Sequence, residues 1–124
     1  MNLSEYFENT KGTGVLATAD SNGNVDVALY ARPHMTDEKQ VAFIMNERLS
    51  YKNITSNPKA AYLFLEEGPG YKGKRLYLTK IRQDTNAELI ASLKRRKSSK
   101  YNEDELKKYL VYFKVDKVRA LVGE

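Results

Sequence analysis

The stretch "KAAYLFLEE", residues 59–67, constrains the fold most, because apolar residues fill both of its alternating sets of positions. Ala61, Leu63 and Leu65 would face one side of a strand, and Tyr62 and Phe64 the other. A strand that is apolar on both faces is covered on both sides. The chain therefore needs a sheet whose second face also meets protein, and not one with a polar face turned to water.

The rest of the chain predicts partner strands for this segment. "DSNGN", residues 20–24, is a hairpin signal because Asn-Gly tolerates positive φ. Pro33 cannot donate to a ladder, so it marks an edge or the end of a strand. We predict a mainly β fold, an antiparallel barrel of about six strands with short helices. The expected strands are 14–20, 25–35, 41–45, 59–67, 74–83 and 111–122.

Short helices are expected between these strands. Asn2 and Glu5 form a capping box for residues 2–11, and Thr85 with Glu88 forms another for a helix running to residue 93. Asn102 predicts a further helix over "EDELKKYL", residues 103–110, and a polar helix over 49–56 ends before Pro58. So few short helices cannot cover a whole sheet face, and a second copy of the chain is the expected cover.

The composition fits one domain spanning residues 1–124 and excludes several kinds of site. There are no cysteines, which rules out disulfides, thiol catalysis and cysteine-ligated metals. No apolar run approaches the roughly 20 residues of a membrane span, and the polar start is not a signal peptide, so we expect a cytoplasmic protein.

The net charge of +5 raises the question of a nucleic-acid partner. Much of the excess lies in "KRRKSSK", residues 94–100, at an expected helix end, where the helix dipole favours cations. We interpret this segment as a solvated helix end, and keep a basic nucleic-acid-binding module as the lower-ranked alternative.

The polar helix before Asn57-Pro58 allows two interpretations. Arg48 and Lys52 are four residues apart and share a face, and Ser50 and Asn53 add short donors. A helix N-terminus offers free N–H groups and a favourable dipole, so this segment could hold a phosphate. The alternative is a solvated surface helix, which the spacing alone does not exclude.

The order of the motifs resembles one family. "GVLATADSNGNVDVALYA", "VAFIM", the polar helix ending in Asn-Pro, and "AAYLFLE" follow one another as in the FMN-binding split-barrel proteins related to pyridoxamine 5′-phosphate oxidase. The resemblance covers residues 7–81. The segment "EEGPGYKGKRLYLTKI" is similar to the small single-domain members of that family.

The resemblance implies a six-stranded antiparallel split barrel and a homodimer with FMN at the interface. It implies that the phosphate lies near the start of the polar helix, and that the ring lies along the second strand. Residues after the fourth strand of the partner would close the site, and we interpret residues 68–73 as a loop across the flavin, with a plain hairpin connection as the alternative. The cofactor-binding residues expected on this basis are Ala28, Leu29, Tyr30, Ala31, Met45, Arg48, Leu49, Ser50, Lys52 and Asn53.

Two departures narrow the expected function. The basic pair of many family oxidases falls on Leu49 and Ser50 here, and the chain lacks the basic, histidine-bearing C-terminal segment of true pyridoxamine phosphate oxidases. We therefore expect an FMN-dependent oxidoreductase or flavin reductase with another small-molecule or electron-transfer partner. The alternative is a protein that binds FMN, heme or a deazaflavin without turnover. His34, the one histidine, is interpreted as structural; no catalytic residue and no metal site are assigned.

Overall fold

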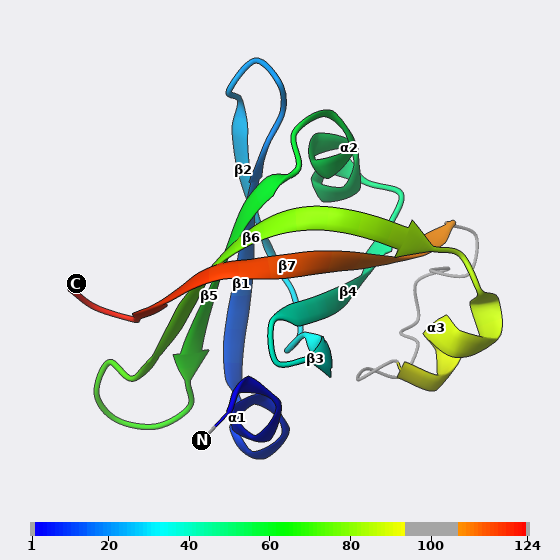
Figure 1. Cartoon of the computed structure of the whole chain (residues 1–124). Coiled ribbons are helices and arrows are strands. Elements are labelled where there is room, and N and C mark those ends of the chain that lie inside the picture. Colours follow the sequence, from blue (N-terminus) through cyan, green and yellow to red (C-terminus); the bar gives the residue numbers. More distant parts are fainter. Residues whose placement is uncertain (1, 94–106, 124) are drawn as a thin grey trace, which may run out of the picture.

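The computed structural model describes residues 2–93 and 107–123. Within them the chain forms a seven-stranded sheet and three short helices (Figure 1). In chain order the elements are α1 Leu3–Asn9, β1 Gly12–Ala19, β2 Val25–Leu29, β3 His34–Asp37, β4 Gln40–Asn46, α2 Leu49–Ser56, β5 Lys59–Glu66, β6 Gly73–Asp84, α3 Ala87–Leu93 and β7 Lys108–Ala120. No helix among the described residues is long and apolar enough to cross a membrane.

The strands lie in the order β2-β1-β5-β6-β7-β4-β3, and every neighbouring pair is antiparallel. The two ends of this sheet, β2 and β3, are consecutive in the chain and are joined only by residues 30–33. The five residue steps from Leu29 to His34 span at most about 18 Å, so the sheet must curl until its two edges approach one another. The edges do not pair, and the sheet is a barrel left open along one seam.

The predicted strand over 25–35 is therefore wrong in one respect. The structure breaks it into β2 and β3, which raises the number of strands from the expected six to seven. Pro33 lies in the break, as its missing N–H requires, but the chain then crosses to the far edge of the sheet and does not simply end its strand.

The helix predicted over 103–110 is also corrected in part. Residues 108–110 belong to β7, where Lys108 pairs with Asn46 and Leu110 with Ile44. The remainder of that predicted helix, and the basic segment 94–100, lie outside the described residues.

The core fills the concave side of the curled sheet. Tyr62 and Phe64 of β5 point inward, as their alternation predicts, and pack with Phe7 of α1 and Phe43 of β4. A smaller cluster on the other side of β4 and β7 is covered by Ile90 of α3. The convex face of β2, β1 and β5 has no such cover in the described chain: Val25, Val27 and Leu29 are 82%, 68% and 66% exposed, and Leu63 and Leu65 are partly exposed.

Candidate functional site

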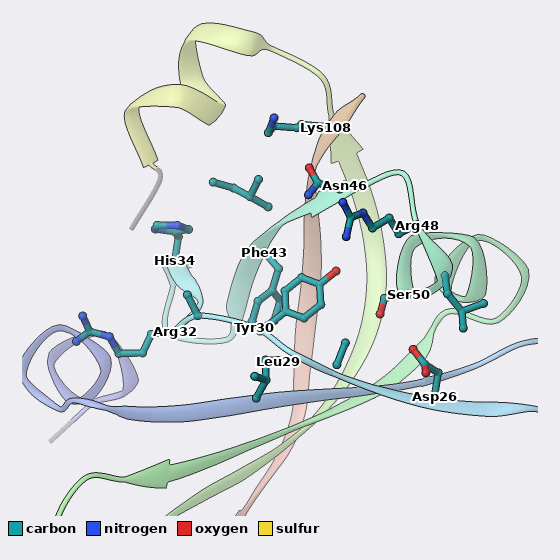
Figure 2. Close-up of a pocket in the computed structure, with 14 residues that line it drawn as sticks. Asp26, Leu29, Tyr30, Arg32, His34, Phe43, Asn46, Arg48, Ser50 and Lys108 are labelled. Carbon is teal, nitrogen blue, oxygen red and sulfur yellow. The ribbon is translucent and has the colours of Figure 1, made fainter. Parts of the chain in front are cut away.

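A groove of about 410 Å³ lies at the open seam of the sheet. Its walls come from β2 and the connection to β3, from β4, and from the start of α2, with one residue each from β3 and β7 (Figure 2). The site thus exists because two consecutive strands end at opposite edges of one sheet. Its lining residues are Asp26, Ala28, Leu29, Tyr30, Ala31, Arg32, His34, Phe43, Ile44, Asn46, Arg48, Leu49, Ser50 and Lys108.

One end of the groove is the N-terminus of α2. Arg48 is the N-cap residue, and its side chain makes no capping hydrogen bond. The first N–H groups of a helix have no partner inside the helix, so here they remain available to an anion, next to the Arg48 guanidinium. Ser50, in the first turn, is 5% exposed and also lines the groove.

Tyr30 forms the middle of the groove wall. Its ring meets Phe43 edge-on, with centroids 5.8 Å apart and planes at 85°. Its backbone is fixed on both sides: the Tyr30 N–H donates to the Gly14 carbonyl at 3.0 Å, and the Tyr62 hydroxyl donates to the Tyr30 carbonyl at 3.1 Å. These two hydrogen bonds therefore hold the Tyr30 backbone in place just beyond the end of β2.

The Tyr30 hydroxyl is a neutral donor at the pH of a cell. Burial raises its pKa above the ordinary value, and the Asp26 carboxylate adds to the rise. A hydrogen bond with Ser50 and the positive charge of Arg48 act in the opposite direction without cancelling it. Tyr30 thus links the aromatic wall to the start of α2.

The charged groups on the groove favour an anionic ligand. Arg32, Arg48 and Lys108 are basic, and Asp26 is the one acidic side chain among the lining residues. Arg32 is partly committed to the fold, because its guanidinium donates to the carbonyls of Phe7 and Thr10 at 2.7 and 3.0 Å. These two acceptors lie at the C-terminal end of α1, where the helix dipole attracts a cation.

The structure brings most of the residues predicted from the sequence to this groove. Ala28, Leu29, Tyr30 and Ala31 arrive from β2 and the connection after it, and Arg48, Leu49 and Ser50 from the start of α2. These two segments are adjacent in space because α2 packs against β1 and β2. Their contact with a ligand remains a prediction.

Three predicted residues are not brought to the groove. Met45 is fully buried in the core, Asn53 donates from its amide to the Thr18 hydroxyl at 3.0 Å, and Lys52 is exposed and absent from the lining. The shared helical face of Arg48 and Lys52 suggested one site, but Arg48 is the N-cap, with extended φ and ψ, and does not follow the helical spacing. The loop 68–73, predicted to lie across a flavin, does not line the groove of its own chain.

Several lining residues were not predicted from the sequence, and only some of them have a local sequence signal that could have identified them. Asp26 belongs to the same alternation as Ala28 and Tyr30, so period two could have found it. Lys108 could not be found, since its segment was predicted to be helical. Asn46 follows the strand "VAFIM" directly, and its buried Oδ1 has no hydrogen-bond partner in the described part of the chain. His34, interpreted as structural, lines the groove from β3.

The described residues contain no group of three or more histidine, cysteine, aspartate or glutamate side chains placed to hold a metal ion. What the groove offers is a helix N-terminus with an arginine and a serine, a flat aromatic and aliphatic wall, and further cations beyond it. Such a site can bind a molecule that has an anionic group at one end and a planar apolar body.

Comparison with known proteins bears on the fold. No protein-family model matches the chain, and no curated protein matches its sequence. Among solved structures, an FMN-binding protein from Syntrophomonas wolfei is 17% identical, with a TM-score of 0.76 over 99% of this chain and 86% of that one. An F420 reductase is 13% identical, with a TM-score of 0.72 over 96% of this chain and 98% of that one.

A candidate pyridoxamine 5′-phosphate oxidase from Lactobacillus delbrueckii is 20% identical, with a TM-score of 0.68 over 94% of this chain and 89% of that one. At these identities the likeness speaks for the backbone arrangement. It agrees with the mainly antiparallel sheet, the three short helices and the open seam described above. The chain therefore has the split-barrel fold of the pyridoxamine 5′-phosphate oxidase-like proteins.

Proposed function

We propose that this chain is a homodimeric, cytoplasmic FMN-binding protein that acts as an oxidoreductase or flavin reductase. The observation that carries the proposal is the groove itself: one continuous site joins an uncapped helix N-terminus, with Arg48 and Ser50, to an apolar aromatic wall. FMN has the matching two parts, a phosphate and a flat heteroaromatic ring.

The phosphate lies at the start of α2 in this proposal. A phosphate monoester is close to doubly charged near neutral pH and accepts hydrogen bonds on three oxygens. The free N–H groups of the first turn, the Ser50 hydroxyl and the Arg48 guanidinium supply donors and positive charge at one point. Asp26 lies on the same groove and limits its positive charge.

The ring lies against Tyr30 and along β2. The Tyr30–Phe43 pair offers the apolar surface that a flat ring would cover. When bound, the flavin supplies the electron chemistry, and the protein contributes binding, orientation and exclusion of water. The protonated Tyr30 hydroxyl then remains a donor inside the site.

The similar FMN-binding protein from Syntrophomonas wolfei supports FMN as the ligand. The similar F420 reductase supports a second candidate, a deazaflavin in the same groove. The two candidates share a flat tricyclic ring and a phosphate on a ribityl chain, so the phosphate end described above serves both.

A dimer is part of the proposal because the convex face is apolar where it has no cover. Val25, Val27 and Leu29 of β2 are largely exposed, and the register places Leu29, Val15 and Leu63 side by side across three strands. Leu29 also lines the groove, so a second copy seated on this face would reach the edge of the site.

The experiment compares Arg48→Ala with Lys52→Ala, which removes a cation from the same helix but outside the groove. Arg48→Ala should weaken FMN about 10- to 150-fold, because one charge-assisted contact contributes about 1.5–3 kcal/mol. Riboflavin lacks the phosphate and should bind both variants as it binds the wild type. Lys52→Ala should leave both affinities within about twofold. Fluorescence titration measures all six constants.

Equal losses of FMN and riboflavin in Arg48→Ala would contradict the phosphate site, and so would a large loss of FMN in Lys52→Ala. Turnover is tested separately. If the loaded protein is an oxidoreductase that accepts nicotinamide electrons, NADH or NADPH bleaches the flavin absorption; a stable spectrum with both donors favours a binding protein without turnover.

A further inference from the structure

The aromatic wall of the groove carries a hydroxyl group toward the start of α2. Tyr30 lies just beyond β2, and Figure 2 shows its hydroxyl turned to the side of the groove where Ser50 and Arg48 lie. The hydroxyl shares a hydrogen bond with the Ser50 side chain. Ser50 belongs to the first turn of α2, is 5% exposed and lines the same groove. One hydrogen bond therefore joins the aromatic part of the groove to the helix N-terminus.

The rest of Tyr30 is fixed by contacts that do not use its hydroxyl. The ring packs edge-on against Phe43, with centroids 5.8 Å apart. The Tyr30 N–H donates to the Gly14 carbonyl at 3.0 Å, and the Tyr30 carbonyl accepts from the Tyr62 hydroxyl at 3.1 Å. A ring held at this many points places its hydroxyl oxygen without further help, so that oxygen can serve as a fixed reference for Ser50.

The direction of the hydrogen bond follows from the chemistry of the two hydroxyls. Each hydroxyl donates one hydrogen bond and can accept others. Tyr30 keeps its proton at neutral pH, because burial raises its pKa, and so can donate to the Ser50 Oγ. The Ser50 proton then points elsewhere. An anion at the start of α2 meets the N–H groups of the same turn that carries Ser50, so the Ser50 proton has an acceptor there.

We propose that Tyr30 is a positioning residue for the phosphate: its hydroxyl holds the Ser50 hydroxyl in the orientation that donates to the anion, without touching the anion itself. The inference rests on the proposed function, which assigns the phosphate to the start of α2 and the flavin ring to the Tyr30 wall. It adds that one side chain acts on both ends of the ligand, by its ring at one end and through Ser50 at the other.

The test begins with Tyr30→Phe, which removes the hydroxyl and keeps the ring and backbone contacts described above. This variant should bind FMN about three- to tenfold more weakly than the wild type, the effect of losing one neutral hydrogen bond. Riboflavin has no phosphate and should bind the two proteins within about twofold. Fluorescence titration measures the four constants, and a loss of packing alone would not change the ratio of FMN to riboflavin affinity.

A double-mutant cycle separates positioning from direct contact. Ser50→Ala should weaken FMN and leave riboflavin within about twofold of the wild type. Adding Tyr30→Phe to Ser50→Ala should then change the FMN affinity by less than about twofold, because the hydroxyl that Tyr30 positions is already absent. If Tyr30 touched the phosphate directly, its loss would weaken FMN as much with Ser50→Ala as without it.

Tyr51→Phe is the matched control. Tyr51 is a buried tyrosine of the same helix, its hydroxyl accepts from the Gln83 amide at 2.9 Å, and it does not line the groove. The control variant loses a hydrogen-bonded hydroxyl close to the site but outside it. It should bind FMN and riboflavin as the wild type does.

Three results would overturn the inference: an unchanged FMN affinity in Tyr30→Phe, equal losses of FMN and riboflavin in that variant, or a full loss of FMN affinity on adding it to Ser50→Ala. In each case the proposed phosphate site still stands if Arg48→Ala weakens FMN alone. A wild type that binds FMN no more tightly than riboflavin would contradict the proposed phosphate site, and the inference with it.

Discussion

Gly14 is the residue on which the position of Tyr30 depends. A Cβ at Gly14 would overlap the Tyr62 hydroxyl and come within 2.5 Å of the Tyr30 carbonyl oxygen. These are the two groups joined by the hydrogen bond that holds the wall of the groove. The absence of a side chain in the middle of β1 therefore makes room for a contact between β5 and the segment after β2.

Gly14→Ala should destabilise the protein by about 1–3 kcal/mol, the usual cost of overpacking, and should weaken flavin binding because Tyr30 is displaced. Urea denaturation and FMN titration measure the two effects. A Gly14→Ala protein as stable as the wild type would show that β1 adjusts freely at this point.

At the residue scale, the sequence was a better guide to residues with a local helix signal than to residues placed by long-range strand pairing. Ser50 and Arg48 were identified from helix chemistry, which is local. Lys52 was predicted as a site residue from its helical spacing to Arg48. That spacing does not apply, because Arg48 is the N-cap and has an extended conformation. Lys108 was not predicted, because the sequence near residue 108 does not indicate the strand register that pairs it with Asn46.

Among the elements, α1 is attached to the sheet by a titratable contact. The Tyr6 hydroxyl donates to the Glu66 carboxylate at 2.6 Å, and the Lys74 ammonium lies 4.8 Å from the Tyr6 ring centroid. Burial, the hydrogen bond and the negative charge of Glu66 all raise the pKa of Tyr6 above its ordinary value near 10. The folded protein therefore retains this proton at pH values where the unfolded chain releases it.

The contribution of this contact is fully present below about pH 10 and is lost progressively as the pH rises toward the folded-state pKa. Tyr6→Phe should lower the free energy of unfolding by about 1.5 kcal/mol at pH 8, and the difference from the wild type should shrink above pH 10. Denaturant melts at several pH values measure it. Tyr71→Phe, at an 82% exposed tyrosine, is the control and should match the wild type throughout. A difference that does not vary with pH would assign the effect to packing.

The elements themselves were predicted unevenly, for a physical reason. The helix α2 and the strand β5 have strong local signals, an Asn-Pro stop and a two-sided apolar run, and both were found with nearly correct bounds. The break between β2 and β3 is set by the closure of the sheet, and Pro33 alone does not reveal that the chain crosses to the opposite edge. The early start of β7 depends on pairing with β4, a partner more than 60 residues away.

At the scale of the whole molecule, the exposed convex face predicts the state of association. Purified protein should have twice the chain mass of 14.2 kDa by sedimentation or light scattering. Val27→Asp should reduce that mass to one chain, because a carboxylate at a residue 68% exposed in the single chain is costly only when a partner covers it. Val122→Asp, a matched change beyond the end of β7, should keep the dimer. A wild type that sediments at the mass of one chain would contradict this.

The place of β7 in the sheet has a consequence for how the protein is made. This strand follows the other strands of the sheet in chain order and is synthesised after them, yet it lies between β6 and β4 and is paired with both. A nascent chain that stops before residue 108 holds only two separate pieces, β2-β1-β5-β6 and β4-β3, which share no ladder. Such non-local pairing is slow to form, and until it forms the two walls of the groove are not held together. We therefore expect the capacity to bind a ligand to appear in a single step, only after β7 has been synthesised.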